Sequence, residues 1–277
     1  MKIFVYGKIS SNANRKNNNY IIKKIKEIYQ DIIILDYDEF NSYDLSNIKL
    51  IIISGGDGII HHIVNKCKNF LDKIVFGFIP TGTANDLCHN IGIKTIEDSL
   101  KVIRENKIVE KKLIEVNDVL CLYAMSIGEM SNVSIKTNKN IKKIFHKLVY
   151  KIKGIRYIFS KKNKVKIINN QNIEIIKVKA FIITNSKYLG GVKINKNIKE
   201  DYQIKIIKNI FNLIEVFIFG RFKTTNTYLK NNLIIENDSK CCIDGEEYIL
   251  EKMIIKINDK KIRLLSKNTW QSFLFVV

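Results

Sequence analysis

The sequence predicts an α/β N-terminal domain with a parallel, doubly wound sheet, followed by a mainly antiparallel β domain, with a cleft between the two. Two observations support this prediction. Over roughly residues 1–115, continuous apolar strands alternate with helices, which is typical of a parallel sheet covered on both faces. Over residues 116–277, many strands are bounded by Asn, Asp or Gly, which is typical of an antiparallel sheet.

The expected elements follow from the apolar pattern. In the first domain we expect strands at 2–6, 32–35, 50–54 and 74–79, and helices at 19–29, 59–67 and 96–104. In the second domain we expect strands at 116–127, 164–168, 173–184, 202–208, 232–235, 240–243 and 252–257. Helices are expected there at 141–159 and 210–221. The last residues of the chain are expected to pack back on the first domain.

Composition narrows the class of protein. The chain has 277 residues, of which 46% are apolar, so a folded core is expected rather than disorder. Its five cysteines show no CxxC pair, which indicates free thiols in a reducing compartment rather than a zinc site. The N-terminus resembles a strand more than a signal peptide, and no apolar run reaches about 18 residues. We therefore predict a cytoplasmic protein.

The net charge of +20 favours an anionic partner. Residues 136–166 contain twelve Lys or Arg and no Asp or Glu, so the excess is concentrated there. An anionic membrane surface, touched peripherally, is the expected partner, and a solvated lysine-rich face is the alternative. No nucleic acid is expected, because no motif that reads RNA or DNA appears.

Chemistry is expected first at SGGDG, which follows a buried strand and precedes a helix. Gly55, Gly56 and Gly58 allow a sharp turn and a close approach of backbone to ligand. Amides at the start of the next helix suit a phosphate. Asp57 would repel that phosphate unless it holds Mg²⁺ or fixes the donors. The alternative is a simple tight turn.

A second run, PTGTAND, follows the next strand of the predicted sheet. Gly82 allows close approach, Thr83 supplies a hydroxyl, and Asn85 or Asp86 could cap the following helix. Both loops should lie at the carboxyl edge of one parallel sheet, where open α/β sheets bind ligands. Two phosphate-suited loops at one edge form a stronger signal than either loop alone.

A third run, IDGEE, lies near the C-terminus. Asp-Gly between apolar strands is a hairpin signal, and that is its simpler interpretation. In extended backbone, Asp244 and Glu246 would project to the same side. A carboxylate pair there could deprotonate a hydroxyl or hold a metal.

The order GGDG, PTGTAND and DGE resembles the diacylglycerol kinase catalytic family, which includes bacterial soluble lipid kinases and sphingosine kinases. The resemblance implies an ATP-dependent kinase acting on a lipid hydroxyl, with residues 1–115 binding nucleotide and 116–277 binding lipid. It also implies a cytoplasmic protein at the inner face of the membrane, and a homodimer is a candidate assembly. Which lipid is the acceptor stays open.

The resemblance assigns a role to each site residue. The ATP-binding set would be Gly55, Gly56, Asp57, Gly58, Ile59, Gly82, Thr83, Asn85, Asp86 and Ser11. Asp57 and Asp86 would belong to the Mg²⁺ and hydrogen-bond network. Asp244 or Glu246 would be the base across the cleft, and the resemblance favours Glu246. Glu200 and Tyr202 fall near a metal-binding turn of the family.

The chain also departs from the family pattern. Ile59 stands where a Thr is expected, YGKISSNAN replaces an NPxSG loop, and an acidic position is missing near Lys112. A second hypothesis is therefore a degenerate lipid-kinase fold that binds nucleotide or lipid without turnover. A third, a soluble-metabolite kinase resembling NAD kinase, is disfavoured by PTGTAND.

Overall fold

The computed structural model describes residues 1–7, 12–128, 162–169, 172–193, 202–209, 211–212, 227–228, 232–237 and 240–267. The expected helices at 141–159 and 210–221 lie outside these ranges, apart from residues 211–212, and so do Ser11 and Glu200. The chain divides into two compact units. One contains Met1–Lys112 together with Asp259–Val277, and the other contains Leu113–Asn258.

The first unit is built on a parallel sheet. Its strands are β1 (Lys2–Tyr6), β2 (Ile32–Asp36), β3 (Leu50–Gly55) and β4 (Val75–Pro80), in the spatial order β2-β1-β3-β4. The end of β18 (Lys252–Leu265) lies parallel to β4 through Arg263 and Leu264. Every residue of β3 is buried, because the sheet is covered on both faces. The predicted doubly wound domain is confirmed.

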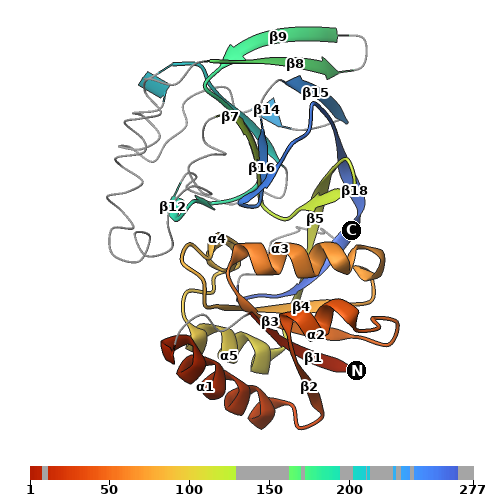
Figure 1. Ribbon diagram of the computed structural model, residues 1–277, viewed down its shortest axis with the longest axis vertical. Helices are drawn as coiled ribbons and strands as arrows, with labels where there is room; N and C mark the ends of the chain where they lie inside the picture. The colour runs from red at the N-terminus through yellow and green to blue at the C-terminus, as the bar shows by residue number, and fades with distance from the viewer. Residues whose placement is uncertain are drawn as a thin grey trace, which may run out of the picture. The chain divides into compact units, whose positions relative to one another are not determined.

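Helices cover both faces of this sheet. They are α1 (Asn12–Ile28), α2 (Tyr37–Ser42), α3 (Asp57–Lys66), α4 (Asp86–Asn90) and α5 (Ile96–Glu105), with a 3₁₀ turn at Lys68–Phe70. Figure 1 shows α1 and α5 together on one face and α3 on the other. No helix was expected at α2, which begins with a capping box. Asp36 accepts a hydrogen bond from the Glu39 amide, and the Glu39 side chain accepts one from the Asp36 amide.

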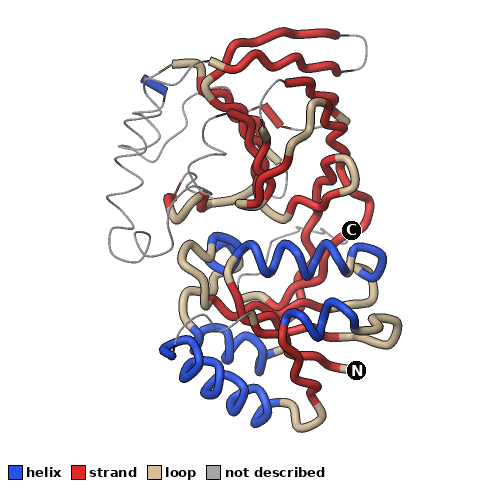
Figure 2. The backbone as a smooth tube through the Cα atoms, viewed as in Figure 1, coloured by secondary structure: helices blue, strands red, loops and turns tan. Residues whose placement is uncertain are grey.

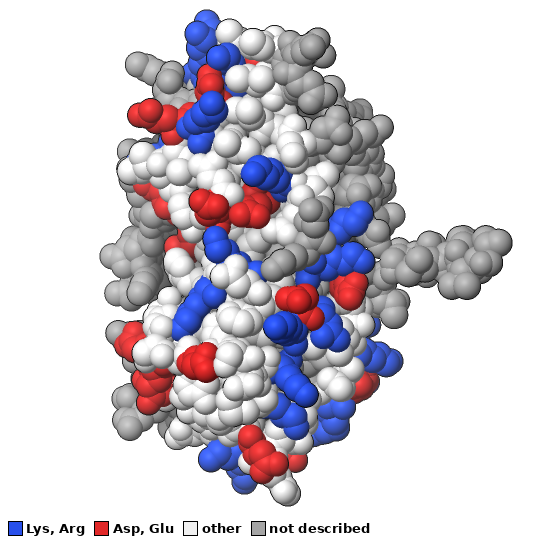
Figure 3. All heavy atoms as spheres, turned by 90° about the vertical axis from the view of Figure 1, so that its right-hand side faces the viewer, with Lys and Arg blue, Asp and Glu red and all other residues white. Residues whose placement is uncertain are grey.

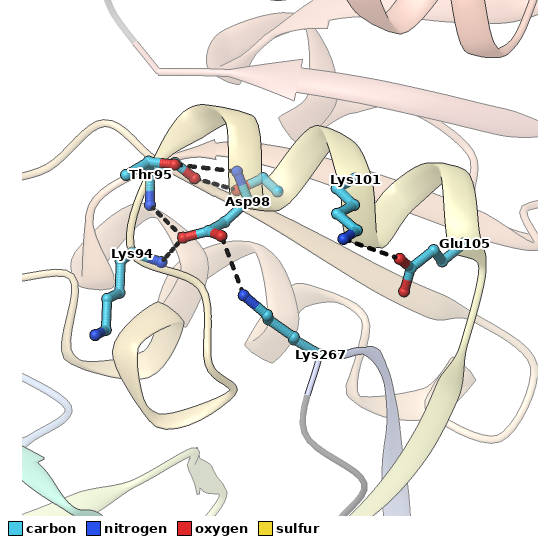
Figure 4. A network of polar contacts seen from close by, with 7 residues as sticks. Lys94, Thr95, Asp98, Lys101, Glu105 and Lys267 are labelled. Carbon is cyan, nitrogen blue, oxygen red and sulfur yellow. Dashed lines mark hydrogen bonds and ion pairs between the residues drawn. The ribbon is translucent and has the colours of Figure 1, made fainter.

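A polar network attaches the C-terminal segment of the first unit to α5 (Figure 4). Thr95 and Asp98 form a capping box at the start of that helix. The Asp98 carboxylate also accepts hydrogen bonds from the Lys94 amide and, at 3.4 Å, from Lys267 Nζ. These bonds help to lower the pKa of the Asp98 carboxyl against the opposing effect of desolvation. The contact fixes the chain just after β18.

The second unit consists of antiparallel sheets (Figure 2). A six-stranded sheet has the spatial order β14 (Thr227–Tyr228), β13 (Gln203–Ile207), β10 (Ala180–Thr184), β7 (Ala124–Gly128), β16 (Cys241–Ile243) and β17 (Glu246–Tyr248). The other sheet joins the start of β18 to β15 (Leu233–Asn237), β8 (Asn163–Asn169) and β9 (Asn172–Val178). Short pairs are β5 (Ile108–Val116) with β6 (Val119–Cys121), and β11 (Tyr188–Leu189) with β12 (Val192–Lys193). The predicted antiparallel region is confirmed.

The core of the second unit lies between these sheets. Apolar side chains from both sheets form one buried cluster, which includes Met125, Ile127, Phe181, Ile183, Val165, Ile235, Met253 and Ile255. Alternate residues along each strand supply these side chains, as the period of two requires. Burying this apolar surface stabilises the unit, because it removes the side chains from water.

Two strands predicted as continuous are broken in the structure. The 116–127 strand is interrupted twice, first at Asn117, whose φ of 55° places it in a left-handed turn between β5 and β6. The second break falls at Leu122 and Tyr123, whose amides bond to a distant carboxylate instead of a neighbouring strand. The 173–184 strand is divided at Lys179 into β9 and β10, which belong to different sheets. An apolar run alone does not reveal such sheet changes.

On the face drawn in Figure 3, acidic side chains lie among the Lys and Arg side chains. Most of the basic run at 136–166 lies outside the described residues. Within the described part of the chain, no helix is long and apolar enough to cross a membrane.

Candidate functional site

The two glycine loops meet at the carboxyl edge of the parallel sheet. Strands β3 and β4 are neighbours, with Gly55 in register with Pro80, so both loops leave the same edge. The Thr81 amide donates a hydrogen bond to the Gly55 carbonyl at 3.2 Å. A Cβ placed on Gly82 would lie only 2.4 Å from the Gly56 Cα. Glycine at position 82 therefore allows the two backbones to touch.

Asp57 ties the two loops together. Its two carboxylate oxygens accept hydrogen bonds from the Asp86 amide at 3.1 Å and from the Leu87 amide at 3.0 Å. These amides open α4, so Asp57 satisfies donors that the short helix leaves without an intrahelical partner. Asp57 was expected either to hold Mg²⁺ or to fix the hydrogen-bond donors of the loops. These contacts support the second role.

The prediction that the side chain of Asn85 or Asp86 caps α4 is wrong. Asn85 stands at the N-cap position with a φ of 51° but makes no side-chain cap bond. Its carboxamide bonds back to the loop instead, accepting from the Gly82 amide and donating to the Gly82 carbonyl. Asp86 is buried at the first helical position. The cap comes from Asp57, about 30 residues earlier in the sequence, which a local motif does not indicate.

A cavity of about 370 Å³ opens beside these loops. It lies within the first unit and is lined by Gly7, Asn18, Ser54, Gly55, Gly56, Ile59, Pro80, Thr81, Gly82 and Ile96. The Ser54 and Thr81 hydroxyl oxygens are 3.5 Å apart. The backbone amides of the glycine turns and the two hydroxyls lie on one wall, and both kinds of group can donate hydrogen bonds to an anion.

The cavity lining differs from the predicted binding set. Gly55, Gly56, Ile59 and Gly82 line the cavity as expected. Thr83 is exposed and does not line it; the hydroxyl beside the cavity belongs to Thr81 instead. Ser54, Thr81 and Gly7 were not predicted, although each follows or ends a buried strand at the same edge. Asn18 and Ile96 lie on helices and carry no local signal.

Ile59 packs its side chain against two glycines. A Cβ on Gly7 would lie 2.3 Å from Ile59 Cδ1, and one on Gly55 would lie 3.0 Å from Ile59 Cβ. The side chain therefore covers the ends of β1 and β3, and part of it faces the cavity. The expected hydroxyl at this position is replaced by an apolar surface.

The IDGEE run forms a hairpin in the second unit. Asp244 and Gly245 connect β16 to β17 with φ values of 51° and 95°, the left-handed pair of a two-residue hairpin turn. The expectation that Asp244 stands in extended backbone, on the same side as Glu246, is therefore wrong. Glu246 is the first residue of β17 and is half-buried.

Asp244 is a buried acceptor of backbone amides. It is 1% exposed, and its carboxylate accepts from the Leu122 amide at 2.6 Å, the Tyr123 amide at 2.9 Å and the Ala124 amide at 3.1 Å. The Asp244 amide donates in return to the Ala124 carbonyl. These contacts hold the break between β6 and β7, so the carboxylate serves the backbone.

Tyr202 supports the same segment. Its hydroxyl donates to the Cys121 carbonyl at 2.9 Å, and burial raises the pKa of this phenol well above its ordinary value. A neutral, hydrogen-bonded phenol is a poor metal ligand, so the structure does not support its side chain in the predicted metal role. Among the described residues, no group of three His, Cys, Asp or Glu side chains could hold a metal ion.

The fold and the loops define a class: an α/β protein with a cavity at the carboxyl edge of a parallel sheet. Residues 9–116 match the family model of the diacylglycerol kinase catalytic domain. A candidate lipid kinase of Staphylococcus carnosus is 26% identical over 234 residues, which cover 77% of this chain and 75% of the relative. A diacylglycerol kinase of Bacillus subtilis is 27% identical over 151 residues, which cover 53% of this chain and half of the relative.

Solved structures show the same fold. A candidate diacylglycerol kinase from Bacillus anthracis aligns with a TM-score of 0.79 at 21% identity and covers 96% of this chain and 95% of its own. An NAD kinase from Archaeoglobus fulgidus, solved in complex with ATP, aligns with a TM-score of 0.54 at 14% identity, covering 96% of this chain and 94% of its own. The resemblance to the diacylglycerol kinase family is confirmed.

Proposed function

We propose that this protein transfers the terminal phosphoryl group of ATP to a hydroxyl of a diacylglycerol-like lipid. The observation that carries the proposal is the meeting of two glycine loops beside a 370 Å³ cavity. The matched family and its diacylglycerol kinase members support a lipid acceptor. On this proposal, residues 1–115 bind the nucleotide and residues 116–277 bind the lipid.

The loops would hold the phosphates through their backbone amides. Asp57 keeps the two loops in register, so the donors are arranged before the ligand arrives, which lowers the free-energy cost of binding. Mg²⁺ is proposed as the companion of ATP, because Mg²⁺ is commonly held by substrate phosphates and one or two carboxylates. Asp57 is the carboxylate proposed for it, because it lies where the two loops meet.

Glu246 is the proposed base for the lipid hydroxyl. Asp244 is the weaker candidate, because its oxygens already accept three backbone amides in the core. A base must lie within hydrogen-bond reach of the proton that it takes. The half-buried carboxylate of Glu246 meets that need better than the buried one.

The test is transfer of label from γ-labelled ATP to mixed micelles that offer several lipid alcohols, diacylglycerol among them. We expect transfer by the wild type and a loss of at least a hundredfold in Glu246→Gln, in line with the contribution of general bases. Glu247→Gln is the matched control, since the Glu247 carboxylate pairs with Lys240. Transfer that survives in Glu246→Gln would refute the role of Glu246.

A second candidate function is a binding module without turnover, which the apolar Ile59 at the cavity favours. It predicts ATP binding by the wild type with no label on any lipid. It also predicts that Ile59→Thr, which places a hydroxyl in that wall, changes ATP affinity without producing transfer.

We further propose a cytoplasmic protein that contacts the inner membrane face through the basic run 136–166. The motivation is the twelve positive side chains of that run. Vesicle pelleting should increase with the anionic lipid content and decrease with salt. Pelleting that depends on neither the anionic lipid content nor the salt concentration would refute the membrane contact.

A homodimer is the proposed assembly. Sedimentation that gives only the 32.2 kDa monomer would refute the homodimer.

A further inference from the structure

Asn18 is a buried amide beside the cavity. It lies in α1, is 7% exposed and lines the cavity next to the loops. Its carboxamide makes no hydrogen bond to another described residue. The carboxamide nitrogen and oxygen are not among the fully sealed, unpaired polar atoms of the described residues, so a group bound in the cavity can reach them. A carboxamide that lines a cavity and makes no bond of its own to the described protein points to a ligand that completes its hydrogen bonds.

The rest of the wall indicates which part of a ligand Asn18 meets. Ser54, Thr81 and the glycine turns make one wall polar, and that wall suits phosphate. The walls contributed by helices consist of Asn18, Ile59 and Ile96. Two aliphatic side chains and one carboxamide suit a ring with polar groups at its edge, which is the chemistry of a nucleoside.

We propose that Asn18 is a nucleoside-binding residue, whose carboxamide hydrogen-bonds the base or the ribose of the bound nucleotide. The inference rests on the proposed function in one respect, namely that the ligand of this cavity is a nucleotide. A carboxamide both donates and accepts, so it matches an adenine edge as well as a ribose hydroxyl. Its contribution is to affinity and orientation, because it touches no reacting atom.

The experiment compares Asn18→Ala with Asn19→Ala by calorimetric titration of ATP. Asn19 is the matched control, since it is the exposed neighbour on the same helix. We expect Asn18→Ala to weaken ATP binding about tenfold, the size of one or two lost hydrogen bonds. Asn19→Ala should bind like the wild type. Inorganic triphosphate should bind the wild type and Asn18→Ala equally, because it has no nucleoside.

Thermal unfolding without ligand separates a binding role from a structural one. If Asn18 serves a ligand, Asn18→Ala should unfold at the wild-type temperature or slightly above it, because no protein partner is lost. A clearly lower unfolding temperature together with unchanged ATP affinity would overturn the proposal.

Ligand variants identify the group that Asn18 contacts. If the tenfold loss of affinity in Asn18→Ala disappears with 2′-deoxy-ATP, Asn18 contacts the ribose. If it disappears with GTP, Asn18 contacts the base. Equal ATP affinity in the wild type and Asn18→Ala overturns the role of Asn18 while leaving the proposed function intact. Equal weakening of ATP and triphosphate also overturns it. A wild type that binds no nucleotide overturns the proposed function and this inference together.

Discussion

Two motif aspartates, Asp57 in the first unit and Asp244 in the second, use their carboxylates in the same way but in different surroundings. Asp57 accepts two backbone amides beside a cavity and is half-buried. Asp244 accepts three and is 1% exposed. An acidic residue in a kinase-like motif can thus serve the backbone first. The difference in burial separates the aspartate beside the cavity from the aspartate in the core.

The largest expected effect is that of Asp244→Ala on stability. It leaves three buried amides without their acceptor, which we expect to cost about 4 kcal/mol of unfolding free energy. Denaturant unfolding measures the loss. Asp244→Asn, which keeps one acceptor oxygen, should lose less. A stability change under 1 kcal/mol in Asp244→Ala would show that these amides find other partners and would break the comparison.

Lys205 offers a second buried charge in the same unit. It is 1% exposed, and burial lowers its pKa to about 8. Since the unfolded side chain titrates near 10.5, the unfolded state binds more protons between pH 8 and 10.5, and stability from this residue rises with pH there. Lys205→Met should remove this increase in unfolding free energy, which amounts to about 3 kcal/mol between pH 8 and pH 10.5.

The measurement for Lys205 is urea unfolding of both proteins at several pH values. The stability advantage of Lys205→Met over the wild type should be largest near pH 8 and should shrink toward pH 10.5. Lys208→Met, at an exposed position near the same strand, is the control. Parallel pH profiles for Lys205→Met and wild type would contradict the shifted pKa.

Asp57→Ala should cost less stability than Asp244→Ala. Two amides rather than three lose their acceptor, and their bonds to Asp57 are only partly buried, so we expect a loss of about 2 kcal/mol. Because the loops lose their tether, ATP affinity should also fall. Paired unfolding and calorimetric titrations measure both effects. A loss of stability as large as that of Asp244→Ala would mean that burial does not separate the two tethers.

Gly82→Ala should have the smallest effect on stability and a clear effect on binding. Its Cβ would meet the Gly56 Cα at 2.4 Å, so the loops must move apart, at about 1.5 kcal/mol. Gly56→Ala is the matched control, because its Cβ would lie 3.2 Å from the Gly82 Cα. In ATP titrations, Gly82→Ala should bind ATP more weakly than Gly56→Ala. The reverse order of affinities would contradict the observed contact.

The alternation of strands and helices in the first unit was predictable because each element carries its own apolar period. Strand β3 and helix α5, for example, lie within one residue of their expected ends. α2 was missed because its six residues are too few to show an apolar period, and its signal is a capping box instead. In the second unit, the breaks at Asn117 and Lys179 could not be predicted, since apolar runs do not show where a chain changes sheet.

The candidate site also has a part that the sequence predicts and a part that it does not. The sequence by itself determined the two glycine loops and their shared edge, because local glycine patterns after parallel strands imply both. Only the tertiary structure decided that Asp57 caps α4, that Asp244 serves the 122–124 amides, and that Asn18 faces the cavity. In the two aspartate contacts, the bonded atoms lie about 30 to 120 residues apart. Hydrogen-bond partners at such separations are brought together by packing, which no local pattern encodes.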